Sequence, residues 1–387
     1  MLNKIAVTVG IITILSCKVF AQENYKSVSK EDSVKAYLGG NQHEVKYYED
    51  KPKSDYPKNI ILMIGDGMGT SQIFAGVTAN GGSLFLDNFN HLGFSKTQSA
   101  SSYITDSAAG GTALSSGYKT YNGAIGVDVD TIAHPSVRAI AEDEGMATGL
   151  VSTSAITHAT PASFIAHQPS RTMYEEIAGD LLKTDIDVFI GGGYKHFADR
   201  KDRKDLITEL KNKGYKVLKD IDEITKVKEG KLAGLTALTH NPEASKRNGM
   251  LPKATETAIN ILSKDDDGFF LMVEGSQIDW GGHQNNTTLL VEEMLDFDEA
   301  IGKALEFAAK NGETLIVITA DHETGGFALT DGDIEKGMVK GDFIWGEHTA
   351  VMVPIFAFGP GAEKFTGIME NSEVGKILIE LVKYKGK

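Results

Sequence analysis

The sequence predicts an α/β fold, a three-layer α/β/α sandwich around a large, mostly parallel central sheet. Short apolar runs alternate with amphipathic stretches along the 387 residues, several runs are apolar at every position, and no Pro- or Ser-rich linker interrupts them. Runs that are apolar on both faces are typical of parallel strands covered by helices on each side. Such alternation without a linker predicts a single domain over residues 59–387.

Hydrophobic periodicity gives the individual elements, and the polar, aperiodic residues 22–58 predict an N-terminal arm ahead of them. The predicted strands are Ile60–Ile64, Ala147–Ser152, Asp187–Ile190, Phe269–Val273, Thr314–Thr319 and Val353–Phe358. The predicted helices are Ser71–Thr78, Ser136–Glu144, Met173–Lys183, Asp205–Lys213, Ala254–Ser263, Leu289–Lys310 and Val374–Tyr384. We expect a turn at the three glycines 191–193, after the third strand.

The first 21 residues carry the pattern of a secretory signal peptide. Lys4 provides a positive charge, residues 5–16 are apolar, and residues 19–21 form a cleavage pattern. The apolar run is too short to span the roughly 30 Å bilayer core as a helix. We therefore expect cleavage after Ala21, a mature chain without a transmembrane segment, and export to the periplasm or out of the cell. Lipid attachment at Cys17 is the alternative for this segment.

Composition argues against a nucleic-acid-binding protein, a disulfide scaffold and a cysteine-based zinc site. The formal net charge is −14, which argues against a nucleic-acid-binding protein because such a protein needs a basic face. The single cysteine lies within the predicted signal peptide. A disulfide scaffold and a cysteine-based zinc site are therefore both excluded.

Acidic residues follow three of the predicted strands. Asp66 lies between glycines after the first strand, Glu274 directly follows the fourth, and Asp321 and His322 follow the fifth. In an open α/β sheet, ligands bind at the carboxyl ends of the strands, so we expect these side chains to line one crevice. Taken alone, Asp66 could equally well close a tight turn with its own side chain.

The segment after Glu274 has the spacing of a metal site. Asp279 and His283 are four residues apart, so one helical turn would place both on one face. A carboxylate with an imidazole suits Zn²⁺, and the alternative is a solvated turn with an N-cap aspartate. His348 precedes the last predicted strand. A lone histidine there is more often structural, but a zinc ion held by Asp279 and His283 needs a third protein ligand.

Ser107 opens a stretch of small residues that has the composition of a short helix. Backbone N–H groups at a helix N-terminus favour an anion such as phosphate, which makes Ser107 a candidate nucleophile. The simpler alternative is that Asp106 or Ser107 only caps the helix. The chain has neither a Gly-x-Ser-x-Gly elbow nor a phosphate-binding Gly-x₄-Gly-Lys-Ser/Thr loop.

Several motifs occur in one order over roughly residues 58–360, most of the mature chain. They are Asp66-Gly-Met-Gly, Asp106-Ser107-Ala-Ala, His158-Ala-Thr160-Pro-Ala-Ser with Arg171, Glu274-Gly-Ser-Gln-Ile-Asp279 with His283, Asp321-His322, and His348. The ordered set resembles the alkaline phosphatase family and is far more specific than any one motif. The fold that this resemblance implies is the same α/β/α sandwich.

The resemblance implies two Zn²⁺ and one Mg²⁺ per subunit, with Zn²⁺ as the alternative occupant of the third site. The implied ligands are Asp279, His283 and His348 for the first zinc, Asp66, Asp321 and His322 for the second, and Asp66, Thr160 and Glu274 for the third metal. The implied reaction is hydrolysis of phosphate monoesters of broad specificity. It passes through a phosphoserine intermediate at Ser107 and releases the alcohol and inorganic phosphate.

Three further residues have roles implied by the resemblance. Arg171 would bind two phosphate oxygens through its planar guanidinium, with a surface salt bridge as the alternative. His158 and Trp280 occupy positions that vary in the family, where the enteric form carries Asp and Lys. His158 near the third site would permit Zn²⁺ there. Trp280 would remove a cation near the phosphate and so weaken its binding, or would act as a hydrophobic lid.

The resemblance also implies a homodimer and a small crown insertion at about residues 328–347. A phosphodiesterase of the same superfamily and a non-catalytic periplasmic binder of metal or phosphate remain as alternatives. A sulfatase would carry proline two residues after its nucleophile, whereas Ser107 is followed by Ala108 and Ala109.

Overall fold

The computed structural model describes residues 35–40 and 42–384, so the signal-peptide prediction lies outside the described residues. The strands of the central sheet are β2 (Asn59–Gly65), β3 (His91–Lys96), β4 (Ala147–Ala155), β5 (Val188–Gly192), β6 (Lys216–Leu218), β7 (Leu232–Leu235), β8 (Phe269–Gly275), β9 (Thr314–Thr319), β14 (Val353–Phe358) and β15 (Gly367–Glu370). The α-helices are α1 (Thr70–Ala79), α2 (Ser107–Ser116), α3 (Val137–Asp143), α4 (Ala159–Ala162), α5 (Tyr174–Leu181), α6 (Tyr194–Ala198), α7 (Leu206–Asn212), α8 (Ile221–Ile224), α9 (Met250–Leu262), α10 (Gln277–His283), α11 (Thr287–Asn311) and α12 (Asn371–Lys383).

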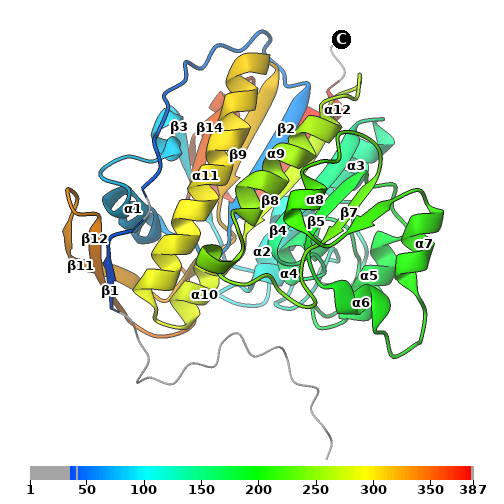
Figure 1. Cartoon of the computed structure of the whole chain (residues 1–387), viewed down its shortest axis with the longest axis horizontal. Helices are drawn as coiled ribbons and strands as arrows, with labels where there is room; N and C mark the ends of the chain where they lie inside the picture. Colours follow the sequence, from blue (N-terminus) through cyan, green and yellow to red (C-terminus); the bar gives the residue numbers. More distant parts are fainter. Residues whose placement is uncertain (1–34, 41, 385–387) are drawn as a thin grey trace, which may run out of the picture.

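Within the described residues, ten strands form one sheet in the order β15-β3-β14-β9-β2-β8-β4-β5-β7-β6. β14 runs antiparallel to both of its neighbours, and the other neighbouring strands are parallel. Helices cover both faces of the sheet, with α9 and α11 lying together across one of them (Figure 1). This arrangement confirms the predicted three-layer sandwich with a mostly parallel sheet.

The central strand β2 shows how the sequence builds two cores. Alternate side chains of a strand point to opposite faces. Ile61 and Met63 pack into a cluster with the buried faces of α9 and α11. Ile60, Leu62 and Ile64 pack into a second cluster with residues of α3, α5 and α12. Each face of the sheet therefore has its own apolar layer, and a strand between them must be apolar throughout.

The six predicted strands and seven predicted helices all occur, and the predicted ends of β9 and β14 match the observed ones. Four strands of the central sheet, β3, β6, β7 and β15, were not predicted. They are short or lie at the sides of the sheet, where a half-exposed strand alternates polar and apolar residues over too few positions. The expected turn at residues 191–193 was wrong for its first two glycines, which belong to β5; only Gly193 has a positive φ.

Two smaller sheets lie outside the main one. β11 (Phe327–Asp333) and β12 (Met338–Phe343) form an antiparallel hairpin, and β1 (Ala36–Leu38) from the N-terminal arm pairs with β12. β10 (Glu323–Thr324) pairs with β13 (His348–Thr349) in a two-stranded ribbon. Among the described residues, none of the helices has both the length and the apolar composition needed to cross a membrane.

Candidate metal centre

The carboxyl ends of three adjacent strands bring acidic side chains together. β2 lies between β8 and β9, and Ile64 of β2 pairs with Glu274 of β8. Asp66 follows β2 directly, and Asp321 lies two residues beyond the end of β9. The parallel arrangement therefore collects three carboxylates at one edge of the sheet, as expected from the sequence, and all three are fully buried.

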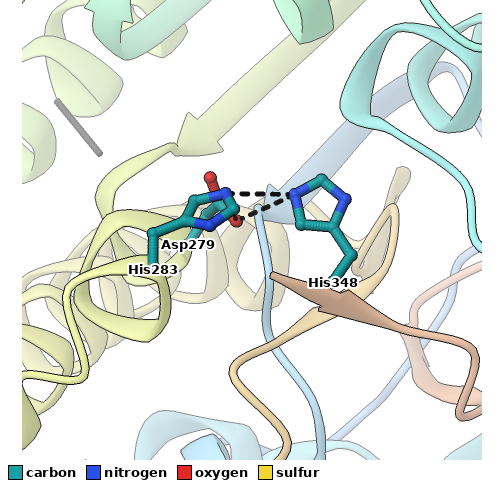
Figure 2. Close-up of side chains that lie close together, drawn as sticks. All are labelled: Asp279, His283 and His348. Atoms are coloured by element: carbon teal, nitrogen blue, oxygen red, sulfur yellow. Dashed lines mark hydrogen bonds and ion pairs between the residues drawn. The ribbon is translucent and has the colours of Figure 1, made fainter. Parts of the chain in front are cut away.

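One group of candidate ligands comes from α10 and β13. Asp279 and His283 lie one helical turn apart on α10 and face His348, as Figure 2 shows. His283 Nε2 lies 3.2 Å from Asp279 Oδ1, and His348 Nε2 lies 3.4 Å from the same oxygen and 3.2 Å from His283 Nε2. Ligands at about 2.0–2.1 Å from a tetrahedral Zn²⁺ lie about 3.3–3.4 Å from one another, so the three atoms fit one zinc ion.

The outer hydrogen bonds of both histidines fix which ring nitrogen is available to a metal. His283 Nδ1 lies 2.7 Å from the carbonyl oxygen of Gly346, and His348 Nδ1 lies 2.9 Å from that of Thr105. A carbonyl can only accept, so each Nδ1 carries the hydrogen and donates it. The lone pair of each imidazole is then on Nε2, the atom that faces the other candidate ligands.

A second group surrounds Ser107. His322 Nε2 lies 3.3 Å from Asp321 Oδ2 and 3.5 Å from Asp66 Oδ1. The hydroxyl oxygen of Ser107 lies 3.3 Å from the same His322 nitrogen. The candidate nucleophile therefore lies next to His322, one of the three residues that the family resemblance implies for the second zinc.

Asp66 also belongs to a third group of candidate ligands. Atoms of Asp66, His158 and Glu274 come within 4.8 Å of one another, and all three residues are buried. Thr160, in α4, is also buried, and its hydroxyl interacts with the Glu274 carboxylate; among the described residues, Asp66 Oδ2 has no hydrogen-bond partner. The hydroxyl of Ser152 donates a hydrogen bond to Glu274 Oε2 at 2.6 Å. Buried oxygens without partners are costly unless a cation binds them.

Electrostatics favour cations in this centre. Burial, and after it the charge of Asp321, raises the pKa of Asp66 well above its usual value. Burial also raises the pKa of Glu274 and of Asp321. Burial lowers the pKa of His322, so its imidazole is neutral and able to bind a metal. Divalent cations would remove the repulsion among the carboxylates and keep them ionised.

Small residues bring α2 and its Ser107 close to the candidate ligands. Every residue of α2 is buried. A Cβ added at Gly110 would lie 2.9 Å from Asp321 Cβ, and one added at Gly111 would lie 3.3 Å from the Cα of Thr160. The Gly-Gly pair therefore lets the helix backbone pass close to both ligand segments, and a side chain at Gly110 would force one of them to move.

Asp106 caps α2 and also holds Arg171. Its Oδ1 accepts from the amide of Ala109, and its Oδ2 accepts from Arg171 Nη1 at 2.9 Å. Burial raises the pKa of Asp106, but Arg171 and the backbone amides outweigh this effect and lower it. Arg171 Nη2 also lies 3.3 Å from His158 Nε2. The guanidinium is thus oriented between the start of the Ser107 helix and the third group.

His240 is a residue of this region that the sequence analysis missed. Its ring packs edge to face against Trp280, at 4.9 Å between ring centroids, and against His158 at 5.3 Å. Trp280 lies in turn 6.5 Å from His158, and is nearly buried. The His240 loop can approach because Gly192 has no side chain: a Cβ there would lie 2.1 Å from the carbonyl oxygen of Thr239. No spacing or motif in the sequence marks His240.

The fold and the centre together define a class of protein. Carboxylates and imidazoles are grouped at the carboxyl edge of a parallel sheet, and a buried serine lies beside them at a helix N-terminus. Adjacent metals beside an activated oxygen are the machinery with which hydrolases transfer phosphoryl groups.

Comparison with known proteins narrows the class. The family model described as Alkaline phosphatase matches residues 57–342, more than half of the chain. The chain is 35% identical to alkaline phosphatase 3 of Bacillus subtilis strain 168, over 87% of this chain and 91% of that one. It is 34% identical to the alkaline phosphatase of Escherichia coli strain K12, over 83% and 85%.

A solved structure agrees with these relatives. The alkaline phosphatase from the Antarctic bacterium TAB5 superposes with a TM-score of 0.80 at 43% identity, covering 87% of this chain and 100% of that one. The chain belongs to the alkaline phosphatase family, and it is a metal-dependent hydrolase of phosphate monoesters.

Proposed function

We propose that this alkaline phosphatase hydrolyses phosphate monoesters by phosphoryl transfer to Ser107, within a centre of two Zn²⁺ and one Mg²⁺. The single observation that carries the proposal is the position of the Ser107 hydroxyl, at the N-terminus of α2 and 3.3 Å from His322 Nε2. A serine buried among candidate metal ligands has no need to be there for helix capping, since Asp106 already caps α2.

The chain's own residues would act in two displacement steps. Ser107 Oγ forms a bond to phosphorus while the bond to the alcohol oxygen breaks on the opposite side, and the serine proton passes through solvent to the departing alcohol oxygen. Water then displaces Ser107 from the phosphoserine: its oxygen bonds to phosphorus, one of its protons restores the serine hydroxyl, and hydrogen phosphate leaves with the other. Arg171, oriented by Asp106, would hold two phosphate oxygens in both steps. When bound, the metals would supply positive charge at the attacking and leaving oxygens.

We assign Asp279, His283 and His348 to the first zinc and Asp66, Asp321 and His322 to the second. The orientation of the two Nδ1 atoms towards carbonyl oxygens supports the first assignment. The chemistry of the second set, two carboxylates and a neutral imidazole, suits the same ion.

We assign Asp66, Thr160 and Glu274 to the third metal. Three oxygen donors suit Mg²⁺, whereas the nearby His158 imidazole favours Zn²⁺. A variant of the TAB5 enzyme in which a histidine is replaced by aspartate has Mg²⁺ bound in a site named M3. This supports the view that His158 would set the metal preference of the third site here.

The test compares the hydrolysis of a phosphate monoester by wild type and by a variant that lacks the Ser107 hydroxyl. Ser107→Ala should lose monoester hydrolysis and keep its metals, whereas Ser116→Ala should keep both, because Ser116 is a buried serine of the same helix that bonds only to the backbone. Metal content and hydrolysis of a monoester and a diester with one leaving group are measured before and after chelation. Full activity of Ser107→Ala would exclude the serine mechanism, and preference for the diester would favour a phosphodiesterase.

Localisation and assembly extend the proposal. We propose that residues 1–21 direct export and are removed after Ala21, and that the mature enzyme is a homodimer. The β1–β12–β11 sheet is our candidate for a small crown, since it covers the expected residues 328–347 in part and stands apart from the central sheet. Mass spectrometry of the mature protein and its mass in solution would test these points.

A further inference from the structure

A single hydroxyl lies between the two groups assigned to zinc. Thr324 Oγ1 donates a hydrogen bond to Asp279 Oδ1, the oxygen that faces His283 and His348. The same Oγ1 lies 3.2 Å from His322 Nδ1. Thr324 is 1% exposed, so water does not compete for either contact.

The hydrogens of this arrangement have one consistent placement. An ionised carboxylate only accepts, so the threonine hydroxyl must donate to Asp279. The threonine oxygen can then only accept a hydrogen bond from His322, so the ring hydrogen of His322 must lie on Nδ1. This tautomer leaves the lone pair on His322 Nε2, the atom that faces Asp66, Asp321 and Ser107.

The surrounding backbone holds Thr324 in place. Thr324 pairs with His348 in the ribbon of β10 and β13, so the segment that carries the third ligand of the first zinc group is tied to it. A Cβ on Gly67 would lie 2.8 Å from Thr324 Oγ1, and one on Gly282 would lie 2.7 Å from its carbonyl oxygen. Gly67 and Gly282 thus pack closely against Thr324, and this close packing fixes the direction of its hydroxyl.

We propose that Thr324 is a positioning residue that couples the two zinc sites, by orienting Asp279 in one and fixing the tautomer of His322 in the other. The inference rests on the proposed function, because it presupposes that both groups hold zinc. Residues that orient metal ligands typically change metal affinity about 10–100-fold when they are lost. Since one hydroxyl serves both groups, its loss should weaken both sites together.

The experiment compares Thr324→Val, which keeps the shape and removes the hydroxyl, with Thr324→Ser, which keeps the hydroxyl. Thr255→Val is the matched control, because Thr255 is equally buried and its hydroxyl donates to the carbonyl of Leu251, in the interior of α9. Metal-stripped proteins are titrated with Zn²⁺ against a chromogenic chelator, and their circular dichroism is compared without metal. Thr324→Ala replaces the valine variant if the latter does not fold.

The expected result is a rise of about 10–100-fold in both zinc dissociation constants of Thr324→Val, with Thr324→Ser and Thr255→Val close to wild type. Unchanged affinities in Thr324→Val, or a change no larger than in Thr255→Val, would overturn the role of the hydroxyl. Weakening of one site alone would overturn the coupling. If wild type itself binds no zinc and hydrolyses no monoester, the proposed function fails instead.

Discussion

Replacing Gly110 by alanine tests whether α2 is held against the metal centre by the absence of a side chain. The new Cβ would lie 2.9 Å from Asp321 Cβ and 3.1 Å from the Asp321 carbonyl oxygen. Neither atom is the free end of a flexible side chain, so the helix or the Asp321 segment must move. Gly179 in α5 is the matched control, because a Cβ there meets nothing within 4 Å.

The two substitutions have the same effect on helix propensity, but only Gly110→Ala also changes the packing. Alanine is favoured over glycine inside a helix by about 0.5–1 kcal/mol, and this gain applies to both variants. Overpacking a close-packed site costs about 1–3 kcal/mol, and this cost applies to Gly110 alone. Gly179→Ala should therefore stabilise the protein slightly, and Gly110→Ala should be less stable than Gly179→Ala by about the overpacking cost.

Urea unfolding followed by circular dichroism measures both variants, first with a chelator and then with Zn²⁺. The chelator isolates the packing effect, and the difference between the two conditions reports how far Asp321 has been displaced as a ligand. Gly110→Ala should gain less stability from zinc than Gly179→Ala. Equal stabilisation of the two variants by alanine would show that α2 does not depend on close contact with Asp321.

Three other substitutions have expected outcomes. Trp280→Lys should strengthen inhibition by inorganic phosphate, because it adds a cation beside the proposed phosphate site; unchanged or weaker inhibition would count against a position near phosphate. His158→Asp should raise the Mg²⁺ content of the third site, measured by metal analysis after exposure to equal Mg²⁺ and Zn²⁺, and continued preference for Zn²⁺ would contradict the role of the imidazole. Asp106→Asn should lower the unfolding free energy of the chelated protein at neutral pH. Because the folded-state pKa of Asp106 is lowered, its contribution is present above the ordinary value of about 3.9 and is lost as pH falls through the lower folded value. A difference from wild type that stays constant on acidification would exclude this charge effect.

The interior of the sheet was predictable because its strands carry their own signal. β2, β8 and β9 are buried at all of their six or seven positions and contain apolar runs of four or five consecutive residues, a pattern that short loops do not show. β6 has three residues and none of them is fully buried, so its sequence contains too little pattern. Such a strand exists because β7 offers a paired edge, and that information is tertiary.

Some residues of the candidate site could likewise be predicted from the sequence, and others could not. Ligands that stand at the ends of strong strands, such as Asp66 and Asp321, are visible because their neighbours in sequence are informative. His240 and Thr324 could not be recognised in this way. His240 contacts Trp280 and Thr324 contacts Asp279, and each partner lies far away in the sequence. Only the position of Thr324 two residues after His322 could have drawn attention to it.

The central place of β2 has a consequence for how the chain folds during synthesis. Asn59 at the start of β2 bonds to Thr314 of β9, 255 residues later. At a synthesis rate of roughly 5–20 residues per second, β2 waits roughly 13–50 s for this partner. Its apolar side chains have no native neighbour strand on that side in the interval. The strand that precedes Asp66 is thus exposed to aggregation during this interval, and neither zinc group can be completed before β9 is made, because Asp321, His322 and His348 all follow β9 in the chain.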